Sequence, residues 1–170
     1  MKRLVIVVPF IVSLWSAVCF AGDYEDGWVA YERGDYKRAV PLLTSAANKG
    51  NALAQTALGF MYYKGRGVSQ DYERAILWLR KAADQGRHGA QLLLAEMCEQ
   101  GKGGPQNYAA AYKWYSRAAA DGFLDKEMRD IAISGRDRAA EKIREVQTQA
   151  GQSQGPDAPA YLTDQKQSGE

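Results

Sequence analysis

Residues 52–86 read "ALAQTALGFMYYKGRGVSQDYERAILWLRKAADQG", two apolar-striped segments joined by a glycine-containing turn. In the second segment, six apolar or aromatic residues recur at the spacing of one face of an α-helix. They are Tyr72, Ala75, Ile76, Leu79, Ala82 and Ala83. The first segment repeats this spacing with Ala54, Leu58, Met61 and Tyr62. The stretch therefore predicts a helix–turn–helix hairpin with one apolar seam.

The sequence of this hairpin repeats along the chain. Residues 34–69 laid over 70–105 without gaps give fourteen identities in thirty-six positions, and a third copy begins near Tyr108. Gly50 and Gly86 stand just past the second helix of their copies, where a left-handed residue can close the last carbonyls. Since one hairpin cannot cover its own seam, neighbouring hairpins are expected to stack and share it.

Residues 52–86 closely resemble a Sel1-like repeat. The features that carry the resemblance are the alanine–leucine–glycine run, the G-x-G-V loop, Asp71, Tyr72, Trp78, Ala82, Ala83 and Gly86. The copy at 87–122 matches with Ala95, Cys98 and Gly104 as departures, and the opening hairpin looks more like the related tetratricopeptide repeat. The resemblance implies an all-α, short right-handed solenoid of stacked helix–turn–helix hairpins with a C-terminal capping helix.

The first 21 residues have the layout of a secretory signal peptide. A basic start is followed by an apolar stretch and by small residues near a cut after Ala21. The alternatives are an uncleaved membrane anchor and, less favoured, a lipid anchor on Cys19. We expect a periplasmic or secreted protein.

The rest of the chain divides by its patterns into five parts. We predict a tetratricopeptide-like first hairpin at 22–50, Sel1-like repeats at 51–86 and 87–122, degenerate or capping helices at 123–150 and a disordered tail at 151–170. Within 123–150, a degenerate helix is expected to precede a charged amphipathic helix at 134–150. A polar-faced terminal helix would cover the last seam of the array.

Composition and motifs give little indication of a catalytic, metal or nucleic-acid site. After residue 21 the chain carries 20 basic and 20 acidic residues, so charge gives no reason to expect nucleic acid as a partner. Cys98, the one remaining cysteine, is expected to be a small core residue, and His88 to serve surface or inter-repeat packing. No cluster has metal-ligand spacing, and we expect no cofactor and no enzymatic activity.

The candidate site is a groove on the inner side of the array, formed by the first helix of each hairpin. Aromatic residues gather at one end and two carboxylates, Glu96 and Glu99, at the other. The predicted protein-binding residues are Trp28, Tyr31, Thr56, Phe60, Tyr63, Lys64, Leu92, Glu96 and Glu99. Such a groove would suit an extended or helical peptide. The alternative is that its aromatics pack against neighbouring helices.

These observations favour an exported, non-enzymatic adaptor or regulator that binds another protein or peptide through its concave face. The resemblance leaves a second reading open, an enzyme acting on the cell wall or on β-lactams, although the paired cysteines of such arrays are missing here. A third reading is a passive structural subunit. Membrane association is expected only through an uncleaved signal, and self-association that completes the short stack is plausible.

Overall fold

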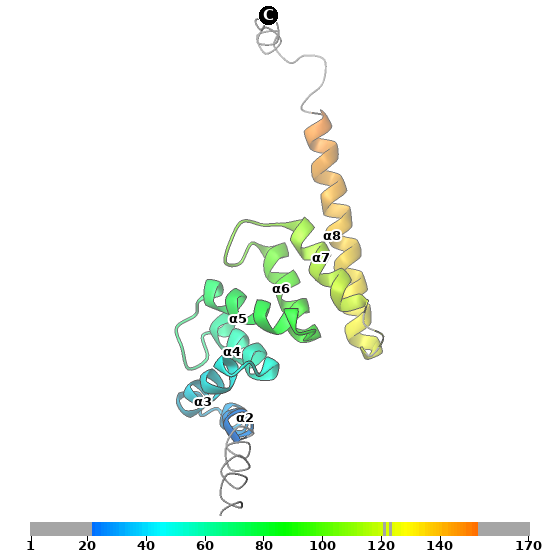
Figure 1. Cartoon of the computed structure of the whole chain (residues 1–170). Helices are drawn as coiled ribbons and strands as arrows, with labels where there is room; N and C mark the ends of the chain where they lie inside the picture. The colour runs from blue at the N-terminus through cyan, green and yellow to red at the C-terminus, as the bar shows by residue number, and fades with distance from the viewer. Residues whose placement is uncertain (1–21, 121, 123, 153–170) are drawn as a thin grey trace, which may run out of the picture.

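The computed structural model describes residues 22–120, 122 and 124–152, and all regular structure in these ranges is helical (Figure 1). The helices are α2 (Gly22–Glu32), α3 (Tyr36–Asn48), α4 (Ala52–Lys64), α5 (Tyr72–Asp84), α6 (His88–Gln100), α7 (Tyr108–Ala119) and α8 (Lys126–Gln152). The predicted signal peptide and residues 153–170 of the predicted tail lie outside the described residues. The predicted all-α array is confirmed.

Helix starts are set by the capping residues that the repeat carries. Asp35, Asn51, Asp71 and Asn107 each accept a hydrogen bond from the backbone N–H three residues later. At the other end, α4 and α6 stop at glycines with a left-handed backbone, Gly65 and Gly101. In the predicted hairpin at 51–86, local backbone chemistry therefore sets both ends of the first helix, at Asn51 and Gly65.

The N-cap of α6 lacks this chemistry. Arg87 has nearly the same backbone as Asn51, with φ −73° and ψ 108° against −64° and 112°, but its side chain accepts no capping hydrogen bond. Arg87→Asn is therefore expected to raise the free energy of unfolding by about 0.5–1 kcal/mol in urea titrations. Arg87→Ala, which removes the same charge and supplies no acceptor, should give no such gain. Equal stability of the two variants would contradict the capping argument.

Consecutive helices pack into hairpins, and the hairpins stack into a curved array (Figure 1). The first helices of successive hairpins also touch, because α2 contacts α4, α4 contacts α6 and α6 contacts α8. The second helices α3, α5 and α7 make no comparable contacts with one another. The first helices therefore lie on the inner side of the curve, as expected from the repeat.

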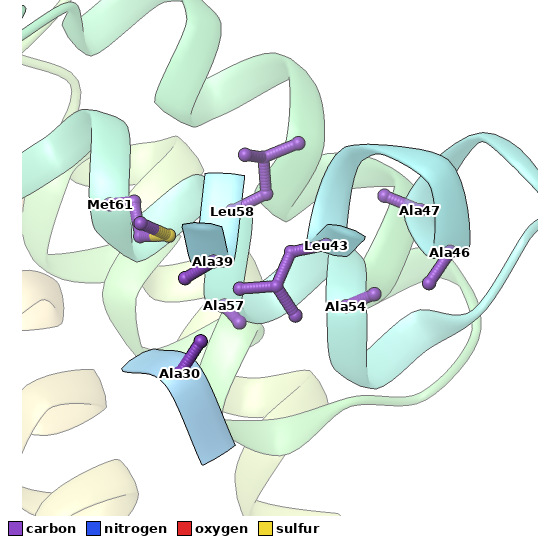
Figure 2. Packing of buried hydrophobic residues seen from close by; sticks show 9 residues of the cluster. All are labelled: Ala30, Ala39, Leu43, Ala46, Ala47, Ala54, Ala57, Leu58 and Met61. Carbon is purple, nitrogen blue, oxygen red and sulfur yellow. The ribbon is translucent and has the colours of Figure 1, made fainter. Parts of the chain in front are cut away.

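Small side chains let the helices approach closely. The core cluster shared by α2, α3 and α4 holds six alanines beside Leu43, Leu58 and Met61 (Figure 2). In the hairpin of α4 and α5, a Cβ added to Gly59 would lie only 2.7 Å from Cγ of Leu79. The hairpin of α2 and α3 repeats this arrangement with Gly27 and Leu43. Each large residue thus fits against a glycine of the facing helix.

Buried glutamines join one hairpin to the next. Gln55 donates from Nε2 to the carbonyl of Ala47 at 3.1 Å, and Gln91 repeats this bond to Ala83 at 3.0 Å. Both carbonyls belong to the last turn of the preceding second helix, where intrahelical donors run out. The two carbonyls also accept the backbone N–H groups of Gly50 and Gly86, so these bonds satisfy the buried amide donors of the two glutamines.

The C-terminal segment differs from the sequence prediction. In place of a degenerate helix followed by a charged one, the structure has a single continuous helix, α8. Counted from the helix starts, Ala139 stands where α4 and α6 have Gly65 and Gly101. Without a glycine to adopt the left-handed conformation, the helix continues to Gln152. Helix α8 thus stacks like the first helix of a fourth hairpin but does not turn back.

Candidate functional site

The structure brings together the aromatic end of the predicted groove. The rings of Trp28 and Tyr31 on α2 stack with their centroids 5.4 Å apart. Tyr24, which the sequence analysis did not single out, extends the stack with its ring centroid 6.4 Å from that of Trp28. The Trp28 side chain remains 37% exposed, and its Nε1 donates to Glu32 at 2.9 Å. An apolar ring surface is therefore presented at this end.

Arg66, which the sequence analysis missed, connects this stack to α4. Its guanidinium lies 5.7 Å from the centroid of Tyr31 and 5.5 Å from that of Phe60, and it donates to the Tyr31 hydroxyl. Arg66 belongs to the turn after α4, whose side chains follow no helical period. The signal that could have revealed it is a cation recurring at this turn position, since Lys102 stands thirty-six residues later.

The prediction that Tyr63 is an accessible residue of the groove is wrong. The groove hypothesis placed its ring among the accessible aromatics, but the residue is buried, with 6% of its surface exposed. Its ring packs in the core cluster that contains Ala75 and Leu79. Lys102 Nζ donates to the Tyr63 hydroxyl at 2.8 Å and lies 4.9 Å from the ring centroid. Tyr63 therefore positions a cation rather than offering a ring face to a ligand.

The acidic end of the groove is partly covered by α8, which is a second correction. Arg138 of α8 forms a two-pronged ion pair with Glu99, with Nε–Oε1 and Nη2–Oε2 distances of 2.5 and 2.9 Å. The Tyr115 hydroxyl donates to the same carboxylate at 3.1 Å. Leu92 packs against the cluster that joins α6, α7 and α8. Glu99 and Leu92 thus hold the terminal helix in place and are not part of an open surface.

The remaining predicted residues divide between the two ends. Lys64 is exposed and lies over the rings of Phe60 and Tyr63, at 5.7 and 4.9 Å from their centroids. The Thr56 hydroxyl donates to the carbonyl of Ala52 on its own helix. Glu96 accepts a hydrogen bond from Gln100 at 2.9 Å. Of the two carboxylates predicted for the acidic end, only Glu96 is free of an ion pair among the described residues.

Ring and cation contacts connect seven half-buried or exposed residues into one group, which we call the aromatic–cation strip. Its members are Tyr24, Trp28, Tyr31, Phe60, Lys64, Arg66 and Lys102. Arg66 joins the rings of Tyr31 and Phe60, Lys64 shares the Phe60 ring, and the buried ring of Tyr63 joins Lys64 to Lys102. The strip runs from the first hairpin across the second to the turn of the third, where Lys102 lies.

The pKa values around α8 are shifted by this ion pair. The Arg138 guanidinium beside it lowers the pKa of Glu99, and burial raises the pKa of Tyr115 to about 12. The hydrogen bond to Glu99 in turn raises the pKa of Arg138. Within the neutral range all three groups therefore keep the protonation states that hold α8 against α6 and α7.

A pH dependence follows from these shifts. Because the pKa of Glu99 is lowered in the folded state, its stabilisation is present above the ordinary value of 4.5 and is lost as the pH falls through the lowered pKa. Between neutral pH and pH values below that pKa, the stability difference between the wild type and Glu99→Gln is expected to shrink by about 1 kcal/mol. Urea titrations across the acid range measure it. A difference that stays constant with pH would contradict the role of the carboxylate.

The other chemistry-bearing residues form no site. Cys98 is half-buried, and burial raises the pKa of its thiol, which disfavours the reactive thiolate. Within the described ranges, no group of three or more His, Cys, Asp or Glu side chains could hold a metal ion. No helix within the same ranges has the length and apolar content needed to cross a membrane.

The fold defines an α-solenoid of stacked helical hairpins. The Sel1 repeat pattern matches residues 15–51, 52–86 and 88–123, and the chain belongs to the Sel1 repeat family. The first hairpin, predicted as tetratricopeptide-like, is thus matched as a Sel1 repeat. No curated protein matches the chain.

Two solved structures are similar to parts of the chain. A protective antigen present in uropathogenic Escherichia coli strains, with an SLR fold, is 29% identical over 72% of this chain with a TM-score of 0.65. A Sel1 repeat protein from Oxalobacter formigenes is 41% identical over 49% of this chain with a TM-score of 0.48. The matches cover 26% and 24% of those proteins, so this chain spans about a quarter of the length of each.

Proposed function

We propose that this protein is an exported adaptor or regulator that binds a protein or peptide segment on the aromatic–cation strip. Sel1 repeats generally mediate protein–protein interaction and form a non-catalytic scaffold. The proposal adds the surface, the strip that runs from α2 of the first hairpin to Lys102 in the turn of the third. It also adds the compartment, the periplasm or the exterior, which rests on the signal-like residues 1–21.

The observation that carries the proposal is the exposed tryptophan within a stack held rigid by its neighbours. Trp28 is fixed by the stacked rings of Tyr24 and Tyr31 and by its hydrogen bond to Glu32. A partner that covers this ring loses little side-chain entropy from the protein, because the ring is already ordered. Tryptophan, tyrosine and arginine are also the residues that most often dominate binding energy at interfaces. All three types meet on the strip.

The proposal is tested by crosslinking in cells, followed by mass spectrometry of the captured partners. We expect Trp28→Ala with Phe60→Ala to remove specific partners while the circular dichroism spectrum of the purified variant stays that of the wild type. Tyr112→Ala is the matched control, because Tyr112 is an aromatic residue with 41% exposure on the second helix α7. The same partners at the same levels in the folded double variant would contradict the proposal and favour a passive structural subunit.

A further inference from the structure

We propose that the partner segment is acidic and that its Asp or Glu carboxylates bind Arg66, Lys64 and Lys102 beside an apolar residue seated on Trp28. This inference rests on the proposed function and adds the chemistry of the ligand. It rests on two observations: aromatic rings surround the three cations, and no carboxylate among the described residues forms an ion pair with them.

Aromatic rings hold the three cations in place. Arg66 lies within 6 Å of the ring centroids of Tyr31, Tyr36 and Phe60. Lys64 shares the Phe60 ring with Arg66, and Lys102 shares the Tyr63 ring with Lys64. The shared rings therefore connect the three charges into a row that runs from Lys64 and Arg66 of the second hairpin to Lys102 in the turn of the third.

No carboxylate among the described residues forms an ion pair with these cations. Elsewhere in the same ranges carboxylates do pair with cations, since Asp23 binds Lys49 and Asp84 binds Arg117. Ring faces attract a cation but do not cancel its charge. The hydrogen bond from Lys102 to Tyr63 raises the pKa of Lys102 and so favours its charged form. A row of ordered, unneutralised cations beside an exposed ring is complementary to an acidic and apolar segment.

Two acidic side chains beside the strip, Glu32 and Glu96, leave this charge available. Glu32 accepts the hydrogen bond of Trp28 and forms no ion pair with Arg66. Glu96 attracts Lys102 electrostatically, but the two form no ion pair within the described ranges. An anionic membrane is the other surface that such cations could meet. The balance of 20 basic and 20 acidic residues after residue 21 gives a membrane no general attraction, and this favours a peptide.

The test is selection of a random displayed peptide library on the purified protein. Enriched peptides are expected to carry Asp or Glu next to Leu, Phe or Trp. The affinity of a synthetic enriched peptide should fall about tenfold in Arg66→Gln with Lys102→Gln, and it should also fall as sodium chloride is raised. Arg80→Gln with Lys113→Gln is the matched control, because both residues are exposed cations on second helices. The control should bind as the wild type does.

The outcomes separate this inference from the proposed function. Enriched peptides without acidic residues, lost in Trp28→Ala but unaffected in Arg66→Gln with Lys102→Gln, would overturn the inference and leave the binding surface in place. Failure to enrich any peptide, or enriched peptides that still bind Trp28→Ala, would overturn both. Binding of phosphatidylglycerol vesicles that competes with the peptides, or sedimentation showing self-association through the strip, would replace the acidic segment by another occupant and overturn the inference.

Discussion

Replacing Leu79 with alanine is expected to lower the free energy of unfolding by about 3–5 kcal/mol, the largest effect of any single change proposed for this chain. Leu79 is completely buried and occupies the space that Gly59 leaves open on the facing helix. Because the glycine has no side chain to move into the cavity, the site cannot collapse easily. In a short array with few shared seams, this loss should appear as a large fall in the urea midpoint.

The same geometry gives a second substitution, Gly59→Ala, whose effect on stability should change sign with the residue at position 79. Gly59→Ala alone is expected to destabilise by about 1–3 kcal/mol, since its methyl group would lie against Leu79. In Leu79→Ala the same methyl group would enter the cavity and recover part of the loss. A double-mutant cycle measures this coupling. Strictly additive effects of the two changes would show that Gly59 and Leu79 do not share one packing space.

Much of the fold could be predicted from the sequence because local chemistry recurs at a fixed spacing. The N-caps Asp35, Asp71 and Asn107 and the left-handed glycines Gly65 and Gly101 act through their own backbone neighbours. Their positions can therefore be read without knowledge of the packing. Stacking then follows, since each hairpin leaves a seam that only another hairpin can cover.

The candidate site was harder to predict because the first helices are buried on more than one side. Helix α4 touches α3, α5, α2 and α6, so its apolar residues do not form a single stripe. Tyr63 lies outside the stripe of Leu58 and Met61 and is nevertheless buried, because α5 packs there. The pairing of Arg138 with Glu99 spans 39 positions and depends on where α8 stacks. Helical periodicity therefore predicts neither the burial of Tyr63 nor the ion pair between Arg138 and Glu99.

Gly135 illustrates how packing overrides the sequence pattern of α8. A glycine costs a helix about 1 kcal/mol relative to alanine, and the charged helix predicted at 134–150 has Gly135 in its first turn. In the structure the helix passes through Gly135, and the ring of Tyr115 lies directly against this glycine. A Cβ at Gly135 would be 2.5 Å from Cε1 of that ring. In the other hairpins the residue at the position of Tyr115 is the smaller Leu43 or Leu79.

Gly135→Leu is therefore expected to displace α8 from α7, although leucine is the better helix former. Its side chain would occupy the space of the Tyr115 ring, at a cost of about 1–3 kcal/mol to the docked state. The Arg138–Glu99 ion pair would be lost with the docking. Hydrogen exchange should show protection falling by about tenfold to a hundredfold in α8, in proportion to that cost, while α3 to α5 keep theirs.

Two further variants decide whether the contact between Gly135 and Tyr115 is the cause. Ser134→Leu places the same side chain on an exposed neighbouring position of α8 and should leave protection unchanged. Tyr115→Leu combined with Gly135→Leu restores the smaller residue of the other repeats, and we expect it to recover most of the protection of α8. Loss of protection in Ser134→Leu, or no recovery in the double variant, would locate the effect in helix propensity or elsewhere in α8. Recovery would instead show that α8 stays docked because Gly135 leaves room for Tyr115, which replaces the leucine of the other hairpins.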